Sequence, residues 1–101
     1  MAWISASQNG TTQSINYSWG APEAYTYIVV KVTRNGSNVY VRYNQANAGT
    51  GETGLNWTPP SYDTYVFEID IWVNGQEQID TSTVVMQRPV QPDVTDFSIF
   101  Q

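Results

Sequence analysis

The chain has 101 residues and a net charge of −5 at pH 7, and it contains neither cysteine nor histidine. This length fits one domain. The missing residue types exclude disulfides, thiolate chemistry and the commonest general base and metal ligand at neutral pH. Only four residues are lysine or arginine, so a nucleic-acid partner is not expected. The apolar runs are far shorter than the roughly 20 residues that cross a membrane, and membrane insertion is not expected either.

Short runs of alternating apolar and polar residues are separated by glycine, proline and asparagine along most of the chain. This pattern predicts an all-β domain of about seven strands, packed as an antiparallel two-sheet β-sandwich. In chain order, the expected strands cover residues 3–7, 14–19, 25–33, 38–43, 55–57, 65–73 and 77–86.

Two Asn-Gly pairs predict tight hairpin turns. Asn35-Gly36 follows the third expected strand, and Asn74-Gly75 follows the sixth. Both central residues of a type I′ turn need positive φ, which Asn tolerates and Gly adopts freely. Because such a turn also fixes the register, Val73 and Gln76 should face each other.

Residues 65–73 form the strand around which the other strands are expected to pack. Its odd positions are all apolar, whereas its even positions from 68 onward read Glu, Asp and Trp. Since side chains on a strand alternate between the two faces, one face should lie in the core. The expected core residues are Trp19, Ile28, Val30, Tyr65, Phe67, Ile69 and Ile71.

Strict alternation in the fourth expected strand groups Val39, Val41 and Tyr43 on one face, and Tyr40 and Arg42 on the other. The last strand has no clear phase, and a bulge or a change of sheet would explain this. On this strand, Ile79 and Val85 share one face, and Val84 and Met86 share the other.

Residues 1–87 are expected to form the β-sandwich module, and residues 88–101 a proline-containing linker with an apolar end. The apolar segment 94–100 is either an edge strand packed back on the domain or the first strand of a following module. The sequence leaves both alternatives open.

Two motifs resemble those of a fibronectin type III or related bacterial immunoglobulin-like module, over about residues 3–86. Ser18-Trp19-Gly20-Ala21-Pro22 matches the Trp of the second strand, and Trp57-Thr58-Pro59 before Thr64-Tyr65 matches the opening of the sixth. The longer spacing between Trp57 and Tyr65 looks more like bacterial surface modules. The resemblance implies a fibronectin type III-like or immunoglobulin-like topology and a corner tyrosine at Tyr65, bonded to the chain upstream. It also implies an extracellular or cell-surface location, the virion surface included.

Glu68 and Asp70 are two carboxylates on one strand face, the residue types that glycosidases use. A flat sheet face offers no desolvation to raise either pKa, and Lys31 and Arg42 are expected on neighbouring strands. We therefore predict cross-strand ion pairs, no catalytic residue and no enzymatic activity.

No metal site or cofactor is expected. The acidic residues of the expected loops and the last strand lack any calcium-binding signature and are interpreted as solvated. They are Glu52, Asp63 and Asp80.

Four aromatic residues, Tyr25, Tyr27, Tyr40 and Trp72, are expected on the outer face of one sheet. Flat aromatic rings stack on sugars and are enriched at interfaces, but aromatic residues also simply suit β-strands. We expect a non-catalytic structural, adhesion or assembly module of a larger bacterial or phage surface protein, monomeric in isolation, with a protein or glycan partner. The alternative is a carbohydrate-binding module that uses this aromatic face.

Overall fold

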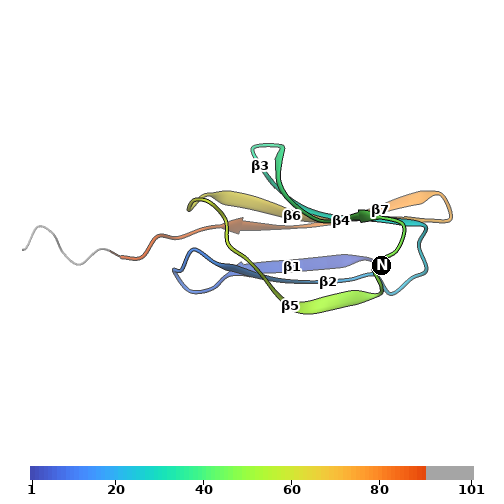
Figure 1. The fold of residues 1–101 in the computed structure, drawn as a ribbon, viewed down its shortest axis with the longest axis horizontal. Coiled ribbons are helices and arrows are strands. Elements are labelled where there is room, and N and C mark those ends of the chain that lie inside the picture. The colour runs from blue at the N-terminus through green and yellow to red at the C-terminus, as the bar shows by residue number, and fades with distance from the viewer. Residues whose placement is uncertain (91–101) are drawn as a thin grey trace, which may run out of the picture.

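The computed structural model describes residues 1–90, which contain no helix. Seven strands form two antiparallel sheets, ordered β1-β2-β5 and β4-β3-β6-β7, that pack face to face (Figure 1). The all-β sandwich predicted from the sequence is thus confirmed. The strands are β1 (Trp3–Gln8), β2 (Ile15–Gly20), β3 (Tyr27–Arg34), β4 (Ser37–Gln45), β5 (Gly51–Trp57), β6 (Thr64–Val73) and β7 (Gln76–Val85). The segment 94–100, whose position the sequence leaves open, lies outside the described residues.

Both predicted hairpin turns are present. The φ angles are 53° and 80° at Asn35 and Gly36, and 52° and 77° at Asn74 and Gly75. These positive values are what a type I′ turn requires. Val73 pairs with Gln76 as expected, so the second turn fixes the register of the long β6–β7 hairpin.

The core lies between the two sheets and contains all seven residues expected there, each almost fully buried. β6 supplies the odd positions from Tyr65 to Ile71, as its alternating pattern predicts. Trp57 reaches into this layer from β5, and its ring centroid lies 5.1 Å from that of Tyr65 and 6.0 Å from that of Phe67.

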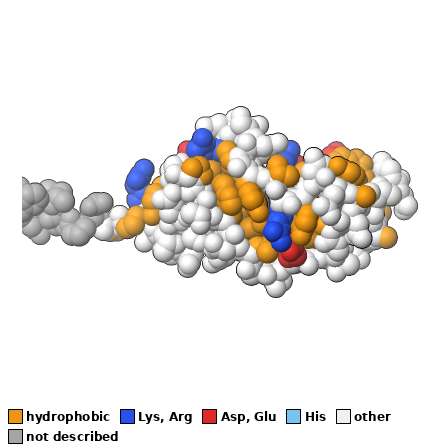
Figure 2. Space-filling model, viewed as in Figure 1, with side chains coloured by type: hydrophobic (Ala, Val, Ile, Leu, Met, Phe, Trp, Pro, Cys, Tyr) orange, Lys and Arg blue, Asp and Glu red, His pale blue; other side chains and the backbone are white. Residues whose placement is uncertain are grey.

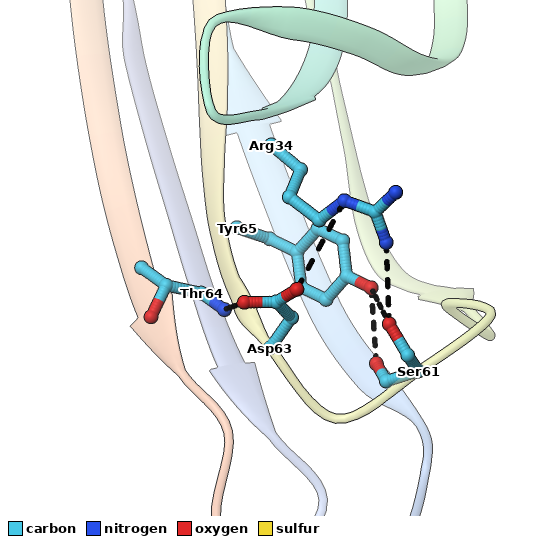
Figure 3. A network of polar contacts seen from close by, with 5 residues as sticks. All are labelled: Arg34, Ser61, Asp63, Thr64 and Tyr65. Atoms are coloured by element: carbon cyan, nitrogen blue, oxygen red, sulfur yellow. Dashed lines mark hydrogen bonds and ion pairs between the residues drawn. The ribbon is translucent and has the colours of Figure 1, made fainter.

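Tyr65 closes a small polar network at the start of β6 (Figure 3). Its hydroxyl donates to the backbone carbonyl of Ser61 at 3.0 Å, which confirms the upstream bond expected of a corner tyrosine. Arg34 donates to Ser61 Oγ at 3.2 Å and lies 3.9 Å from Asp63 Oδ2. Asp63 also accepts a bond from the N–H of Thr64, so interpreting Asp63 as merely solvated was wrong.

The strict alternation expected in β4 is wrong. Two register shifts against β3 each add a residue to β4, so that Tyr40 pairs with Val32, Val41 with Lys31, and Tyr43 with Val30. Tyr40 and Tyr43 pack against the core, whereas Val41 is exposed. A bulge re-aims every side chain beyond it, which explains why Tyr40 and Val41 exchanged faces.

β7 shows no register shift against β6. Val84 and Met86 are buried, whereas Ile79 and Val85 are exposed. The even-numbered side chains therefore point inward along the whole strand. The sequence of β7 does not show which face is buried, because polar residues occupy most of these inward positions.

The inward polar side chains of β7 bind the edge of β1. The backbone N–H groups of Ala2, Ile4 and Ala6 donate to Gln78 Oε1, Asp80 Oδ2 and Ser82 Oγ, at 3.4, 2.9 and 3.1 Å. Edge strands carry free N–H groups that invite further pairing. This row of three bonds occupies such groups on β1 and on the residue before it, and it shows that Asp80 is not merely solvated either.

The chain enters and leaves the sandwich at opposite ends (Figure 1). At one end the N-terminal amine lies 2.9 Å from Glu23 Oε1. At the other end the backbone N–H of Gln87 donates to the Gln8 side chain at 2.7 Å.

Candidate functional site

The strongest candidate site is a hollow at the β6–β7 turn, which we call the Tyr27–Trp72 hollow. Tyr27 and Trp72 are register partners on β3 and β6. Their ring centroids lie 6.1 Å apart with the ring planes at 72°. Together with Thr26 and Gly75 they line a space of about 460 Å³. Tyr27 donates to Asn44 Oδ1 at 2.5 Å, so its ring is held in place.

The structure separates the other two predicted aromatic residues from this pair. Tyr40 lies on the core side of β4, stacked on Trp57 with centroids 5.6 Å apart and planes at 25°. Tyr25 precedes β3 and packs against the core, and its hydroxyl donates to the Gly49 carbonyl at 2.7 Å. The predicted outer face of four aromatic residues is therefore wrong. Of the four, the exposed Tyr27 and the half-buried Trp72 lie together on the outer face.

Tyr25 instead borders a second hollow, of about 630 Å³. The segments before β3 and after β4 line it, and Tyr25 is the one aromatic residue of the lining. The lining residues are Pro22, Glu23, Ala24, Tyr25, Asn47, Gly49 and Thr50.

Asp70 occupies an unusual position on the outer face of the four-stranded sheet. It is only 7% exposed, and its Oδ1 is buried without a hydrogen-bond partner. Burial and the neighbouring carboxyl of Glu77, with a smaller effect of Glu68, raise the pKa of Asp70 to about 7. The expectation that this face offers no desolvation is wrong. The cause is visible in the register, since Asp70 lies between the apolar Val29 and Ile79.

The predicted ion pairs are half correct. Lys31 lies 3.9 Å from Glu68, its register partner on the same face. Arg42 instead turns to β5, where its Nη2 lies 2.7 Å from Glu52 Oε2. Glu52 also accepts a bond from Trp19 Nε1 at 3.0 Å. The hydrogen bond from Arg42 holds the pKa of Glu52 below its usual range, so Glu52 serves the structure and is not merely solvated.

Chemically, the Tyr27–Trp72 hollow is suited to binding. Its lining consists of the aromatic rings of Tyr27 and Trp72, of Thr26, which carries a hydroxyl, and of the turn residue Gly75. Aromatic surface provides contact area and a π-face at little cost in side-chain entropy. Asp70, whose pKa is raised by burial, is not part of the lining, and its Oδ1 is inaccessible.

Within residues 1–90, no group of three or more Asp, Glu, His or Cys side chains is arranged to hold a metal ion. The described part of the chain also has no helix of the length and apolarity needed to cross a membrane. Comparison of the chain with protein-family models, curated proteins and solved structures found no match.

Proposed function

We propose that the protein is a non-catalytic structural, adhesion or assembly module of a larger bacterial or phage surface protein. The observation that supports this most is that the chain enters and leaves the sandwich at opposite ends. β1 begins at one end, and β7 ends at the other (Figure 1). A domain with this arrangement can be joined head to tail with others, and each added domain lengthens the array.

Two further observations support a module of the fibronectin type III or immunoglobulin-like kind. Tyr65 makes the corner bond to Ser61, and Trp19 of the Ser-Trp motif is fully buried. The chain also carries few charges, with 13% charged residues, and most of the surface in view in Figure 2 carries no Lys, Arg, Asp or Glu colour. An extracellular or virion surface is part of this proposal.

A tandem protein tests the proposal. One, two and three copies of residues 1–101 would be joined directly and studied by small-angle X-ray scattering and thermal unfolding. We expect the maximum dimension to grow almost linearly with copy number and the melting temperature to stay constant. Compact particles whose copies pack side by side would contradict the proposal, as would mutual destabilisation of the copies.

The Tyr27–Trp72 hollow favours carbohydrate binding as a second candidate function. The half-buried indole of Trp72 lines the hollow and could stack a single sugar ring, although two rings at 72° do not form a continuous flat platform. A glycan array would compare the wild type with Trp72→Ala. Trp3→Ala is the matched control, because Trp3 is exposed on the other sheet. Binding lost only in Trp72→Ala supports this function, and binding by none or all of the three proteins contradicts it.

A further inference from the structure

β7 is an unusually regular edge strand. It pairs with β6 alone within residues 1–90, over ten consecutive pairs without a shift. Because Val73 and Gln76 flank a two-residue turn, the even-numbered residues of β7 exchange backbone hydrogen bonds with β6. The odd-numbered N–H and C=O groups then point away from the sheet. These residues are all exposed and comprise Glu77, Ile79, Thr81, Thr83 and Val85.

The other edge strands in the described part of the chain are protected. Side chains of β7 occupy the edge N–H groups of β1. β4 carries two register shifts, and β5 carries one beside Gly54, where φ is +68°. Bulges of this kind are a common means of blocking unwanted pairing. β7 has neither device, and its outer face carries apolar surface, with Ile79 52% and Val85 62% exposed.

We propose that β7 is a docking edge that binds an extended segment of a partner protein by antiparallel strand addition. In this mode, main-chain hydrogen bonds supply affinity and alternate side chains supply specificity. The inference goes beyond the proposed role in an array, and the outcome of the tandem experiment does not depend on it.

The side chains beside the edge define the chemistry of the partner segment. Glu77 makes no ion pair within residues 1–90, and the chain carries a net charge of −5. The partner side chain next to Glu77 is therefore lysine or arginine, since opposite charges on neighbouring strands attract. The partner side chains next to Ile79 and Val85 are apolar, and those next to Thr81 and Thr83 are β-branched.

The probe is a synthetic nine-residue peptide that alternates valine with threonine and carries one lysine near its C-terminus, where antiparallel addition places it beside Glu77. Amide hydrogen exchange of the protein is measured with and without the peptide. We expect the amides of Ile79, Thr81 and Thr83 to exchange rapidly in the free protein and at least tenfold more slowly with saturating peptide. The amides of Asp80 and Ser82 should be protected in both states. A peptide with the lysine moved to its N-terminus should bind about two- to fivefold more weakly.

Two variants test the edge itself. Thr81→Pro removes an outward N–H that the β6–β7 ladder does not use, a position at which an edge strand tolerates proline. Ile79→Lys removes the apolar contact and leaves the backbone intact. We expect both to abolish peptide binding. Val41→Lys is the matched control, because it places the same charge on the shifted edge strand β4, and it should bind like the wild type.

The proposal is overturned if the odd-numbered amides of β7 are already protected in the free protein, or if the peptide leaves their exchange unchanged. Equal binding by Ile79→Lys and the wild type also overturns it. The oligomeric state is measured by sedimentation equilibrium. A dimer that forms without peptide and is abolished by Thr81→Pro would also contradict the proposal. In that case the edge belongs to a second copy of this chain and not to a partner segment.

Discussion

The carboxylate of Asp80 on β7 accepts a hydrogen bond from the backbone N–H of Ile4 on β1 at 2.9 Å. A side chain of the four-stranded sheet thereby supplies a hydrogen-bond acceptor to the edge of the three-stranded sheet. Ile4 is buried, so water cannot readily replace the carboxylate as acceptor.

Asp80→Ala should therefore destabilise the domain measurably. Leaving a buried N–H without its charged acceptor costs about 1.5–3 kcal/mol, which chemical denaturation would detect. Ser82→Ala is the matched control, because it removes the neutral acceptor of the Ala6 N–H and should cost only about 0.5–1.5 kcal/mol. Equal losses for the two variants would show that the charge of Asp80 does not strengthen its bond.

Tyr65→Phe isolates the corner hydrogen bond, because the aromatic ring remains and only the hydroxyl that donates to Ser61 is removed. We expect a loss of about 0.5–1.5 kcal/mol in the free energy of unfolding. Tyr62→Phe removes a comparable but exposed bond to the Thr11 carbonyl and should change the stability less. If Tyr62→Phe proved the more costly change, the corner would not contribute as described.

The raised pKa of Asp70 predicts a specific dependence of stability on pH. Asp70 has a pKa of about 7 in the folded protein, against an ordinary value of 3.8, so folding favours the protonated carboxyl. This contribution is complete below about pH 4 and is lost as the pH rises through 7. Since one pKa unit corresponds to about 1.4 kcal/mol, the loss is at most about 4 kcal/mol.

Asp70→Asn should consequently be more stable than the wild type at pH 8, with a flatter pH profile between 4 and 8. Asp63→Asn is the control, because Asp63 is an ion-paired carboxylate next to Arg34 and lies outside the cluster around Asp70. Denaturant titrations at several pH values measure both variants. An unchanged slope in Asp70→Asn would assign the pH dependence to other groups.

Gly75→Val should cost roughly 1–3 kcal/mol, because it places a β-branched residue at a φ of +77°. Gly75→Asn at the same position should lose much less, since asparagine tolerates this conformation. Similar melting temperatures for the two Gly75 variants would contradict a dependence of the hairpin on this turn.

Period-two alternation and the two Asn-Gly turns were sufficient to predict the sandwich, most of its strands and its seven central core residues. These signals are local, and the turn chemistry and the apolar pattern agree with each other. The first strands and the last hairpin needed no further information, whereas the corner tyrosine was expected only because the motifs around Trp57 and Tyr65 resemble those of fibronectin type III-like modules.

The candidate site was predicted less well because it depends on non-local features. The two shifts in β4 come from its pairing with β3, and no residue type in β4 announces them, so Tyr40 was assigned to the wrong face. Asp70 is buried because its register partners on the two neighbouring strands are the apolar residues Val29 and Ile79. The bond between Arg42 and Glu52 joins a strand to a segment interpreted as a loop. In each case the register had to be known first.

The row of bonds between β1 and β7 has a mechanical consequence. Both strands run from the end that holds Glu23 toward the end that holds Gln8, because Gln78 lies beside Ala2 and Ser82 beside Ala6. A force that stretches the molecule between its two ends pulls these strands in opposite directions along their own axes. The three side-chain bonds and the six β1–β2 pairs are then loaded together in shear. The first strand acts as a shear clamp, a useful property in a domain that has to carry tension.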